Sequence, residues 1–324
     1  MSVEFCGLQL AHPIVNGSGT FDAIAARGVF GEQLLQEFPF AAYVSKTITL
    51  EPRAGNPPPR LWETPAGLIN SIGLPNKGLH GYLLEDLPQL AEITGGGDGR
   101  AAIPLITNVM GATAEELARL VEACDAQSQI AAIELNVSCP NVKSGLDIGA
   151  DPLQLEQVVS AVRGHTSKPL IVKLTPNTAD VPACALAAEA AGADAVSLIN
   201  TLRATALAPP AGRGGADERR DRWLGGGNGG LSGPAIRPVA LAQVAAVAAR
   251  VTVPVVGMGG VQSAAHAQDL LDVGATLVAV GTESFRDPAT ATRIARELAS
   301  SAFTQPSASL RGHSDDRPNH RSEE

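Results

Sequence analysis

The sequence predicts a (β/α)8 TIM barrel, and two observations support this fold class. Eight short apolar runs recur along the chain, and segments with helix-capping residues separate them. Short continuous runs rich in β-branched residues are typical of parallel strands that are covered on both faces. Eight alternations of strand and helix favour a closed barrel, with a doubly wound open sheet as the lesser possibility.

The eight expected strands are apolar for most of their length. They occupy the segments PIVNGSG from Pro13, AAYVSKT from Ala41, IPLITNVMG from Ile103, AAIELNVSC from Ala131, PLIVKLTP from Pro169, DAVSLINT from Asp194, PVVGMGG from Pro254 and TLVAVGT from Thr276. Near the N-terminus, the alternating segment VEFCGLQLAHP is expected to form a short hairpin that closes the bottom of the barrel.

The segments between the strands carry helix boundary signals. Thr113 followed by Glu116 matches a capping box, and Asp151 before Pro152 matches an N-cap followed by a first-turn proline. Gly192 stands where a helix should end in a left-handed residue before the next strand begins. These signals place helices between the expected strands.

The length and composition fit one large domain. The chain has 324 residues, 44% of them hydrophobic, which is enough to bury a large core. We expect a single domain over residues 1–302 and a disordered tail over 303–324, because the tail lacks apolar periodicity. The net charge of −9 and the scattered basic residues argue against a nucleic-acid or membrane partner. No signal peptide or membrane-spanning run is present, so a cytoplasmic location is expected.

The four cysteines do not form a metal-binding or disulfide pattern. They stand at positions 6, 124, 139 and 184 with no CxxC pair, so no metal site is predicted. Cys124 and Cys184 fall within helical segments among apolar residues and are expected to be packing residues. Cys139 is different, because it directly follows a strand, in the segment ELNVSCPNVK, and this position favours a chemical role.

The carboxyl ends of the expected strands carry polar residues and glycines. Active sites of this fold collect at that end of the barrel. Turn residues alone would explain some of these positions, but not two lysines and a thiol at the same level. The candidate site residues from this pattern are Ser18, Lys46, Thr47, Asn108, Asn136, Cys139, Lys173, Asn200, Thr201, Gly259, Gly260, Gly281 and Thr282.

Glycines after the last two strands indicate a site for a phosphate group. GMGG follows the seventh strand, VGT ends the eighth, and Gly233 lies in the segment GGLSGP. Glycine allows backbone amides to approach an anion, and the loops after strands 7 and 8 are the usual phosphate site of this fold. A phosphorylated cofactor or substrate is therefore expected.

Several longer motifs resemble those of class 1 dihydroorotate dehydrogenases, most closely the class 1B catalytic subunit. The motifs are RAGNPPPRLWET, NSIGLPNKG, NVSCPNVK, VKLTPN, INT, GGLSGPAIRPVAL, VPVVGMGGV and VAVGT, and they occur in the family's order. The resemblance runs from about Val3 to about Leu298.

The resemblance implies a flavin reaction in de novo pyrimidine synthesis. It implies that (S)-dihydroorotate is oxidised to orotate, that Cys139 removes the C5 proton and that hydride passes from C6 to N5 of FMN. Lys173 is implied to stabilise negative charge on the reduced flavin. By the same resemblance, the FMN-binding residues are Ser18, Lys46, Thr47, Asn108, Asn136, Lys173, Ile199, Gly233, Gly259, Gly260, Gly281 and Thr282.

The substrate site is implied in the same way. Lys46 is expected to face the substrate carboxylate, and asparagine amides suit the amide-like edges of the pyrimidine because they both donate and accept hydrogen bonds. The implied substrate-binding residues are Lys46, Asn70, Ser71, Ile72, Gly73, Leu74, Asn136, Asn200 and Thr201.

The resemblance also implies partners. Class 1B enzymes form homodimers joined by an electron-transfer subunit into a heterotetramer, and that subunit carries FAD and a 2Fe-2S cluster and passes electrons to NAD. The alternatives are a class 1A enzyme that reduces fumarate, a non-catalytic flavin-binding scaffold, and a related flavin enzyme acting on uracil or thymine. The segment around 203–229 looks longer than the usual family loop and is expected to be a mobile lid or partner contact.

Overall fold

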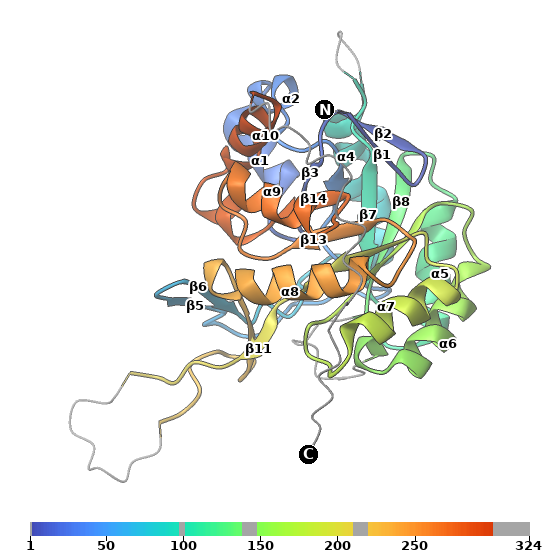
Figure 1. The fold of residues 1–324 in the computed structure, drawn as a ribbon. Coiled ribbons are helices and arrows are strands. Elements are labelled where there is room, and N and C mark those ends of the chain that lie inside the picture. Colours follow the sequence, from blue (N-terminus) through green and yellow to red (C-terminus); the bar gives the residue numbers. More distant parts are fainter. Residues whose placement is uncertain (1, 97–100, 138–147, 210–219, 301–324) are drawn as a thin grey trace, which may run out of the picture.

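Eight parallel strands form one sheet that curls into a nearly closed barrel (Figure 1). The computed structural model describes residues 2–96, 101–137, 148–209 and 220–300. The order of the barrel strands in the sheet is β3-β14-β13-β10-β9-β8-β7-β4. Their bounds are β3 (Ile14–Asn16), β4 (Tyr43–Val44), β7 (Leu105–Val109), β8 (Ile130–Asn136), β9 (Leu170–Lys173), β10 (Ala195–Leu198), β13 (Val255–Met258) and β14 (Leu277–Val280). Seven lie within the predicted segments, and β8 begins one residue before its predicted segment, so the predicted fold class is confirmed.

Helices follow the barrel strands along the chain and cover the outside of the sheet (Figure 1). The helices are α1 (Ala23–Phe30), α2 (Gln33–Gln36), α3 (Gly78–Gly81), α4 (Leu87–Thr94), α5 (Ala114–Asp125), α6 (Pro152–Arg163), α7 (Val181–Ala190), α8 (Arg237–Ala248), α9 (Ala264–Asp272) and α10 (Thr290–Ser300). The described residues also form a π-helical segment, η1 (Tyr82–Asp86), and three 3₁₀ segments, η2 (Ile148–Ala150), η3 (Pro234–Ile236) and η4 (Thr282–Phe285).

The predicted helix boundaries are present. The Thr113 side chain accepts a hydrogen bond from the Glu116 amide at 3.2 Å, and the Glu116 carboxylate accepts one from the Ala112 amide at 2.7 Å. Asp151 caps α6 by accepting from two first-turn amides. Gly192 has a φ of 93° just after α7, where a residue with a side chain would be strained.

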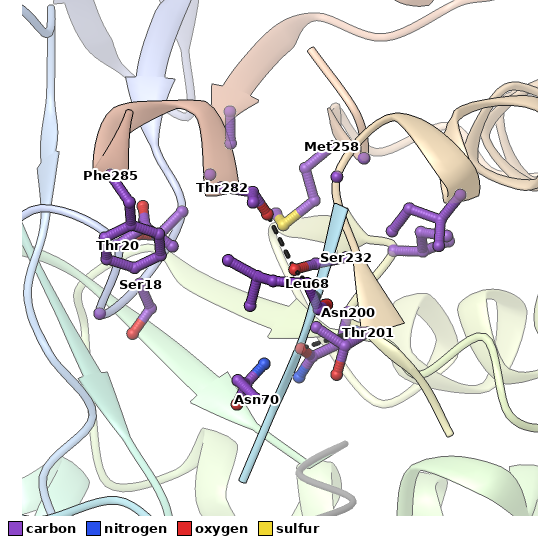
Figure 2. A pocket seen from close by; sticks show the side chains of 18 of the residues that line it. Ser18, Thr20, Leu68, Asn70, Asn200, Thr201, Ser232, Met258, Thr282 and Phe285 are labelled. Atoms are coloured by element: carbon purple, nitrogen blue, oxygen red, sulfur yellow. Dashed lines mark hydrogen bonds between the residues drawn. The ribbon is translucent and has the colours of Figure 1, made fainter. Parts of the chain in front are cut away.

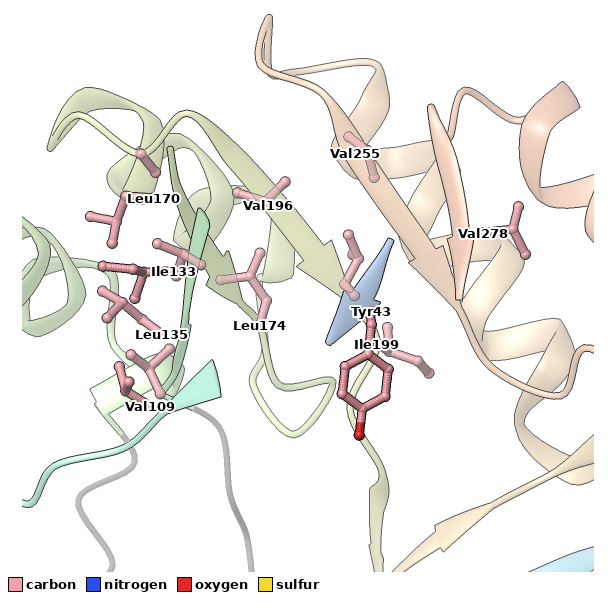
Figure 3. Packing of buried hydrophobic residues seen from close by; sticks show 14 of the residues in the cluster. Tyr43, Val109, Ile133, Leu135, Leu170, Leu174, Val196, Ile199, Val255 and Val278 are labelled. Atoms are coloured by element: carbon pink, nitrogen blue, oxygen red, sulfur yellow. The ribbon is translucent and has the colours of Figure 1, made fainter. Parts of the chain in front are cut away.

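The strand residues alternate between two hydrophobic clusters. In β8, Ala132 belongs to the cluster inside the barrel, whereas Ile133 and Leu135 pack between the strands and the helices (Figure 3). Because side chains along a strand point to opposite faces in turn, Glu134 and Asn136 also face the barrel interior. The interior is therefore apolar in its lower part and polar toward the carboxyl ends of the strands.

The N-terminal hairpin closes the lower end, as predicted. Strands β1 (Val3–Phe5) and β2 (Leu8–Leu10) pair antiparallel. Phe5 and Leu10 are at most 1% exposed and belong to the interior cluster. Their side chains thus plug the end of the barrel opposite the polar layer.

Between β3 and the segment of β4, one backbone hydrogen bond, from the Ala41 amide to the Ile14 carbonyl at 2.9 Å, and one side chain complete the barrel. Strands β3 and β4 are the two ends of the sheet order. Asn16 on β3 is 1% exposed, its Nδ2 donates to the Val44 carbonyl at 2.7 Å, and its Oδ1 accepts from the Val44 amide at 2.8 Å. The carboxamide thus takes the place of a backbone peptide unit and joins the two strands.

A second sheet of four antiparallel strands accompanies the barrel. Its order is β11-β12-β6-β5, with β5 (Leu61–Thr64), β6 (Gly67–Asn70), β11 (Leu202–Ala204) and β12 (Gly229–Ser232). The prediction of a loop over 203–229 was therefore wrong at both ends, since β11 and β12 include its boundaries. The hydrogen bonds from the Trp223 amide to the Ala206 carbonyl and from the Ala208 amide to the Asp221 carbonyl extend this pairing. The Trp62 and Trp223 rings pack edge to face, 5.7 Å apart.

Replacing Asn16 by alanine is expected to lower the free energy of unfolding by about 2–4 kcal/mol, because it leaves the buried Val44 amide and carbonyl without partners. Equilibrium denaturation measures the change. The control is Gln157→Ala on the exposed face of α6, which is expected to change stability by less than about 0.5 kcal/mol. Equal stability of the two variants would contradict the role of Asn16 in closing the barrel.

Candidate active site

A cavity of about 500 Å³ opens at the carboxyl ends of the barrel strands (Figure 2). Its walls come from the strand ends of the barrel and from the antiparallel sheet above them. A volume of this size is ordinary for a site that holds a cofactor or a small substrate. The location agrees with the predicted position of the active site.

Most of the predicted site residues line this cavity. From the predicted cofactor set, the lining includes Ser18, Lys46, Thr47, Asn136, Lys173, Ile199, Gly233, Gly259, Gly260, Gly281 and Thr282. From the predicted substrate set, it includes Lys46, Asn70, Ile72, Gly73, Leu74, Asn136, Asn200 and Thr201. Asn108 and Ser71 are fully buried outside the lining, and Cys139 lies outside the described residues.

The described lining includes two lysines and one glutamate, Glu283, so its formal net charge is positive. Lys173 ends β9 with 5% of its surface exposed, whereas Lys46 follows β4 and is exposed at the mouth. Within the described ranges, neither ammonium has a carboxylate within 4.0 Å. A buried ammonium without a countercharge is costly, so this arrangement favours an anionic ligand.

Hydroxyl and amide groups form a network on one side of the cavity. Thr47 Oγ1 accepts a hydrogen bond from Asn136 Nδ2 at 3.3 Å and lies 3.3 Å from Ser18 Oγ. Ser18 Oγ also donates to the Ser45 carbonyl at 2.9 Å. These bonds hold Asn136 and Thr47 beside the two lysines, where they present polar atoms to a ligand.

Asparagines from separate elements meet on another wall. Asn70 ends β6 and donates from Nδ2 to the Gly230 carbonyl at 3.2 Å, while the Thr201 amide donates to Asn200 Oδ1 at 2.9 Å. Figure 2 shows Asn70, Asn200 and Thr201 together in the cavity. Amide side chains placed in this way can recognise a ligand that has both donors and acceptors at its edge.

The segment from Asn70 to Leu74 has an unusual backbone. Leu74 has a φ of 54° and Gly73 a φ of 77°. A Cβ at Gly73 would lie 2.5 Å from the Asn56 amide nitrogen, so only glycine fits there. Ser71 is fully buried and anchors the segment, because its Oγ donates to the Asn228 carbonyl at 2.8 Å.

Three glycines with positive φ line another part of the cavity. Gly233, Gly259 and Gly260 have φ values of 90°, 138° and 69°. A Cβ at Gly260 would lie 2.8 Å from the Arg237 Cβ and 2.9 Å from the Gly233 carbonyl oxygen. Gly281 stands at the start of η4, and the adjacent Thr282 Oγ1 donates to Ser232 Oγ at 2.8 Å. The backbone of these loops can therefore approach an anion closely.

Several residues that line the cavity were not predicted from the sequence. Leu61, Leu68 and Ser232 reach the cavity from the antiparallel sheet, which was not predicted. Phe285 lies on η4 at the mouth and remains 60% exposed (Figure 2). The alternation in LWET and GLIN around the two residues Pro65 and Ala66 was the available signal for a hairpin.

The cysteines of the described part are structural. Burial raises the pKa of the Cys124 thiol to about 12, and burial also raises the pKa of Cys184. Burial, with Asp194 and Glu4 nearby, raises the pKa of Cys6 to about 12. None of these three is a ready thiolate at neutral pH. Among the described residues, no cluster of His, Cys, Asp or Glu could hold a metal ion, and no helix is suited to crossing a membrane.

The barrel and this cavity define a class of protein. A (β/α)8 barrel with a positively charged cavity and glycine-rich loops after its last two strands is typical of enzymes that bind a phosphorylated cofactor or substrate. Comparison with known proteins narrows this class. Residues 1–301 match the family model described as dihydroorotate dehydrogenase, and the chain belongs to that family.

Curated relatives support the same assignment. The chain is 44% identical over 299 residues to the dihydroorotate dehydrogenase B (NAD(+)) catalytic subunit of Citrifermentans bemidjiense, covering 92% of each chain. It is 44% identical over 301 residues to the protein of the same name from Desulforudis audaxviator, covering 92% of this chain and 91% of that one. In fold, it resembles the crystal structure of the Eimeria tenella dihydroorotate dehydrogenase in complex with ferulenol, with a TM-score of 0.71 at 22% identity over 92% of this chain and 83% of that one.

The cavity fits the flavin cofactor that the family implies. A flavin phosphate requires accessible backbone amides, and Gly233, Gly259 and Gly260 line the cavity with backbone conformations that residues with side chains rarely adopt. The flavin ring gains negative charge on reduction, and the buried Lys173 ammonium has no protein carboxylate against it within the described ranges. The residues present therefore suit such a group.

Replacing Gly260 by alanine is expected to weaken flavin binding at least tenfold, because the added Cβ would press on Arg237 and on the Gly233 carbonyl. The absorbance ratio of flavin to protein after purification measures the effect. Gly164→Ala is the matched control, since Gly164 has a φ of −67° and open space around it. Full flavin content in the Gly260 variant would show that these loops do not bind the phosphate.

Proposed function

We propose that this chain is the catalytic subunit of an NAD-linked dihydroorotate dehydrogenase, which oxidises (S)-dihydroorotate to orotate in pyrimidine synthesis with FMN as cofactor. One observation of the structure gives the main support for this proposal. Lys46 and Lys173 face a cavity lined with asparagines and, among the described residues, have no carboxylate partner. The names of the relatives at 44% identity support the same reaction.

The FMN phosphate would lie against the amides near Gly233, Gly259, Gly260, Gly281 and Thr282. The flavin ring would lie beside Lys173 and Asn136, which also line the cavity. When bound, FMN accepts the hydride that dihydroorotate loses. Lys173 stabilises the negative charge that the reduced ring carries. Asn108, although buried outside the lining, remains a proposed contact through its unpartnered Oδ1.

The substrate would be held by its charge and by its amide-like edges. Lys46, exposed at the mouth, would bind the carboxylate, and a charge-assisted hydrogen bond of this kind is roughly twice as strong as a neutral one. Asn70, Asn136, Asn200 and Thr201 would bind the ring. The segment 70–74 completes this part of the pocket, with Ser71 acting from beneath through its bond to the Asn228 carbonyl.

Cys139 would act as the base that removes the C5 proton. In the sequence it stands two residues after Val137, and β8 ends at Asn136. A thiolate is the reactive form of cysteine, and a cationic neighbour favours it. The three cysteines of the described part have raised pKa values, so they are poor alternatives for this role.

The electrons would leave through a second subunit. The relatives are named NAD(+) catalytic subunits, which supports a partner subunit and NAD as the acceptor. We propose that this partner carries FAD and a 2Fe-2S cluster. We infer a homodimer of this chain with two such partners in the cytoplasm. A class 1A enzyme, which reduces fumarate without a partner, is the alternative that the same site would also serve.

Anaerobic mixing of the FMN-loaded chain with dihydroorotate tests the reaction. Flavin absorbance is expected to bleach, and neither NAD nor fumarate is expected to restore it quickly unless the electron-transfer subunit is added. Rapid reoxidation by fumarate would indicate a class 1A enzyme. Failure of the loaded protein to bleach would overturn the substrate assignment.

Cys139→Ser is the matched variant in this experiment. It is expected to retain FMN but to bleach orders of magnitude more slowly, because a serine hydroxyl is far less acidic than a thiol and does not ionise to give the base. A rate equal to that of the parent chain would remove Cys139 from the reaction.

Replacing Lys46 by alanine is expected to weaken dihydroorotate binding by about 10- to 100-fold, because the variant loses a hydrogen bond to a charged group. Binding of a neutral dihydropyrimidine should change much less. Titration of both ligands into the FMN-loaded variant gives the comparison. Equal losses for both would contradict the carboxylate contact and would favour an enzyme acting on uracil or thymine.

A further inference from the structure

A buried carboxylate that has no role in the proposed reaction lies beneath the cavity. Glu134 is 4% exposed and faces the barrel interior from β8, two residues before Asn136. Its Oε1 accepts a hydrogen bond from Asn108 Nδ2 at 2.5 Å, and its Oε2 accepts one from Ser197 Oγ at 2.8 Å. Both donors are neutral. In the part of the chain that the structure describes, no Lys or Arg lies within 4.0 Å of Glu134.

The strand register places this carboxylate below Lys173. The sheet aligns Asn136 on β8 with Lys173 on β9, and Lys173 with Ser197 on β10. Glu134 starts one inward-facing layer lower on β8 and reaches Ser197 two strands away. Its carboxylate therefore crosses the inner side of β9 beneath the Lys173 side chain.

The same carboxylate fixes the orientation of Asn108. Because Nδ2 of Asn108 donates to Glu134, its Oδ1 is left as an acceptor, and that atom is buried with no hydrogen-bond partner. Asn108 is itself fully buried. A buried acceptor without a donor is costly unless a ligand supplies one, and the N–H group of a flavin ring is a donor of the required kind.

We propose that Glu134 is a positioning residue that lowers the reduction potential of the bound flavin. The inference rests on the proposed function, because it requires FMN in this cavity. Lys173 favours negative charge on the reduced ring, and the Glu134 carboxylate opposes that effect from one layer below. NAD⁺ is a weak oxidant, so an NAD-linked path needs a cofactor that releases its electrons readily. Glu134 supplies that bias, and Asn108 keeps the ring in place above it.

Glu134→Gln tests the charge while preserving the hydrogen bonds. The glutamine oxygen can still accept from Asn108, and its amide group can donate to the Ser197 hydroxyl, which accepts as well as donates. At a fixed ambient potential, the ratio of reduced to oxidised flavin is expected to rise about tenfold in the variant, as for a unit charge acting at short range in a medium of moderate dielectric. For a two-electron couple this equals ~30 mV. Equilibrium reduction with a redox dye measures it.

Ser197→Ala is the matched control, because it removes one hydrogen bond to Glu134 and keeps the charge. Its ratio is expected to change less than about threefold. FMN titrations into the apoproteins give a second readout. Binding of oxidised FMN should be similar in both variants, whereas Glu134→Gln should bind reduced FMN about tenfold more tightly.

An unchanged or lowered ratio in Glu134→Gln, or equal shifts in the two variants, would overturn the proposal. If Glu134→Gln does not fold, Glu134→Met removes the charge while Asn108 is kept, and it must show the same rise. These outcomes are separate from failure of the proposed function. That failure would appear in the parent chain, either as no FMN binding or as no bleaching by dihydroorotate.

Discussion

The structure depends on the two-residue alternation of side chains within a closed parallel barrel. Every second residue of a strand must enter a narrow interior, where side chains from all eight strands meet in layers. In β8 those inward positions are Ala132, Glu134 and Asn136, so one strand passes from apolar packing to polar chemistry within five residues. The lower layers and the N-terminal hairpin stabilise the barrel. The layer of side chains at the carboxyl ends of the strands is polar and lines the cavity.

Closure makes this division possible. The backbone ladder runs through eight strands but does not join β3 to β4, and the Asn16 carboxamide bridges the two by imitating a peptide unit. A barrel that opened there would expose the interior to water and would separate the strand ends. Lys46 and Thr47 stand two and three residues after Val44, the last residue of β4. The position of the proposed carboxylate contact therefore depends on the hydrogen bonds between Asn16 and Val44.

Three charged side chains follow one another from the mouth of the cavity into the barrel interior. Lys46 is at the exposed mouth, Lys173 is buried at the end of β9, and Glu134 lies one layer further down. In the proposed mechanism this order would separate three tasks: Lys46 would attract an anionic substrate, Lys173 would favour negative charge on the cofactor, and Glu134 would limit that effect. Electrostatic interactions in a site with little water are strong. Substitutions that change one of these three charges therefore alter the chemistry of the site without altering the fold.

Sequence patterns predicted the parts that follow local rules. The eight barrel strands, the N-terminal hairpin and the cap at Asp151 are set by short-range periodicity and by capping chemistry, and each was found. Most of the predicted strand-end residues line one cavity, Asn108 is buried just outside it, and Cys139 lies outside the described residues.

The missed features depend on long-range contacts. Strand β12 pairs with β6 across about 160 residues of sequence, as in the bond from Asn70 to Gly230, and the β5–β6 turn at Pro65 and Ala66 lacks the Asn-Gly signature of a tight hairpin. The roles of Asn16 and Glu134 rest on side-chain bonds to distant strands. No local pattern encodes such bonds.

A crystal structure of this chain with FMN and orotate bound would test the account most directly. We expect the phosphate to lie against the amides around Gly233, Gly260 and Gly281. The flavin ring should lie above Lys173, and the orotate carboxylate should contact Lys46. A phosphate bound elsewhere, or a ring that lies away from Lys173 with orotate on its far side, would contradict it.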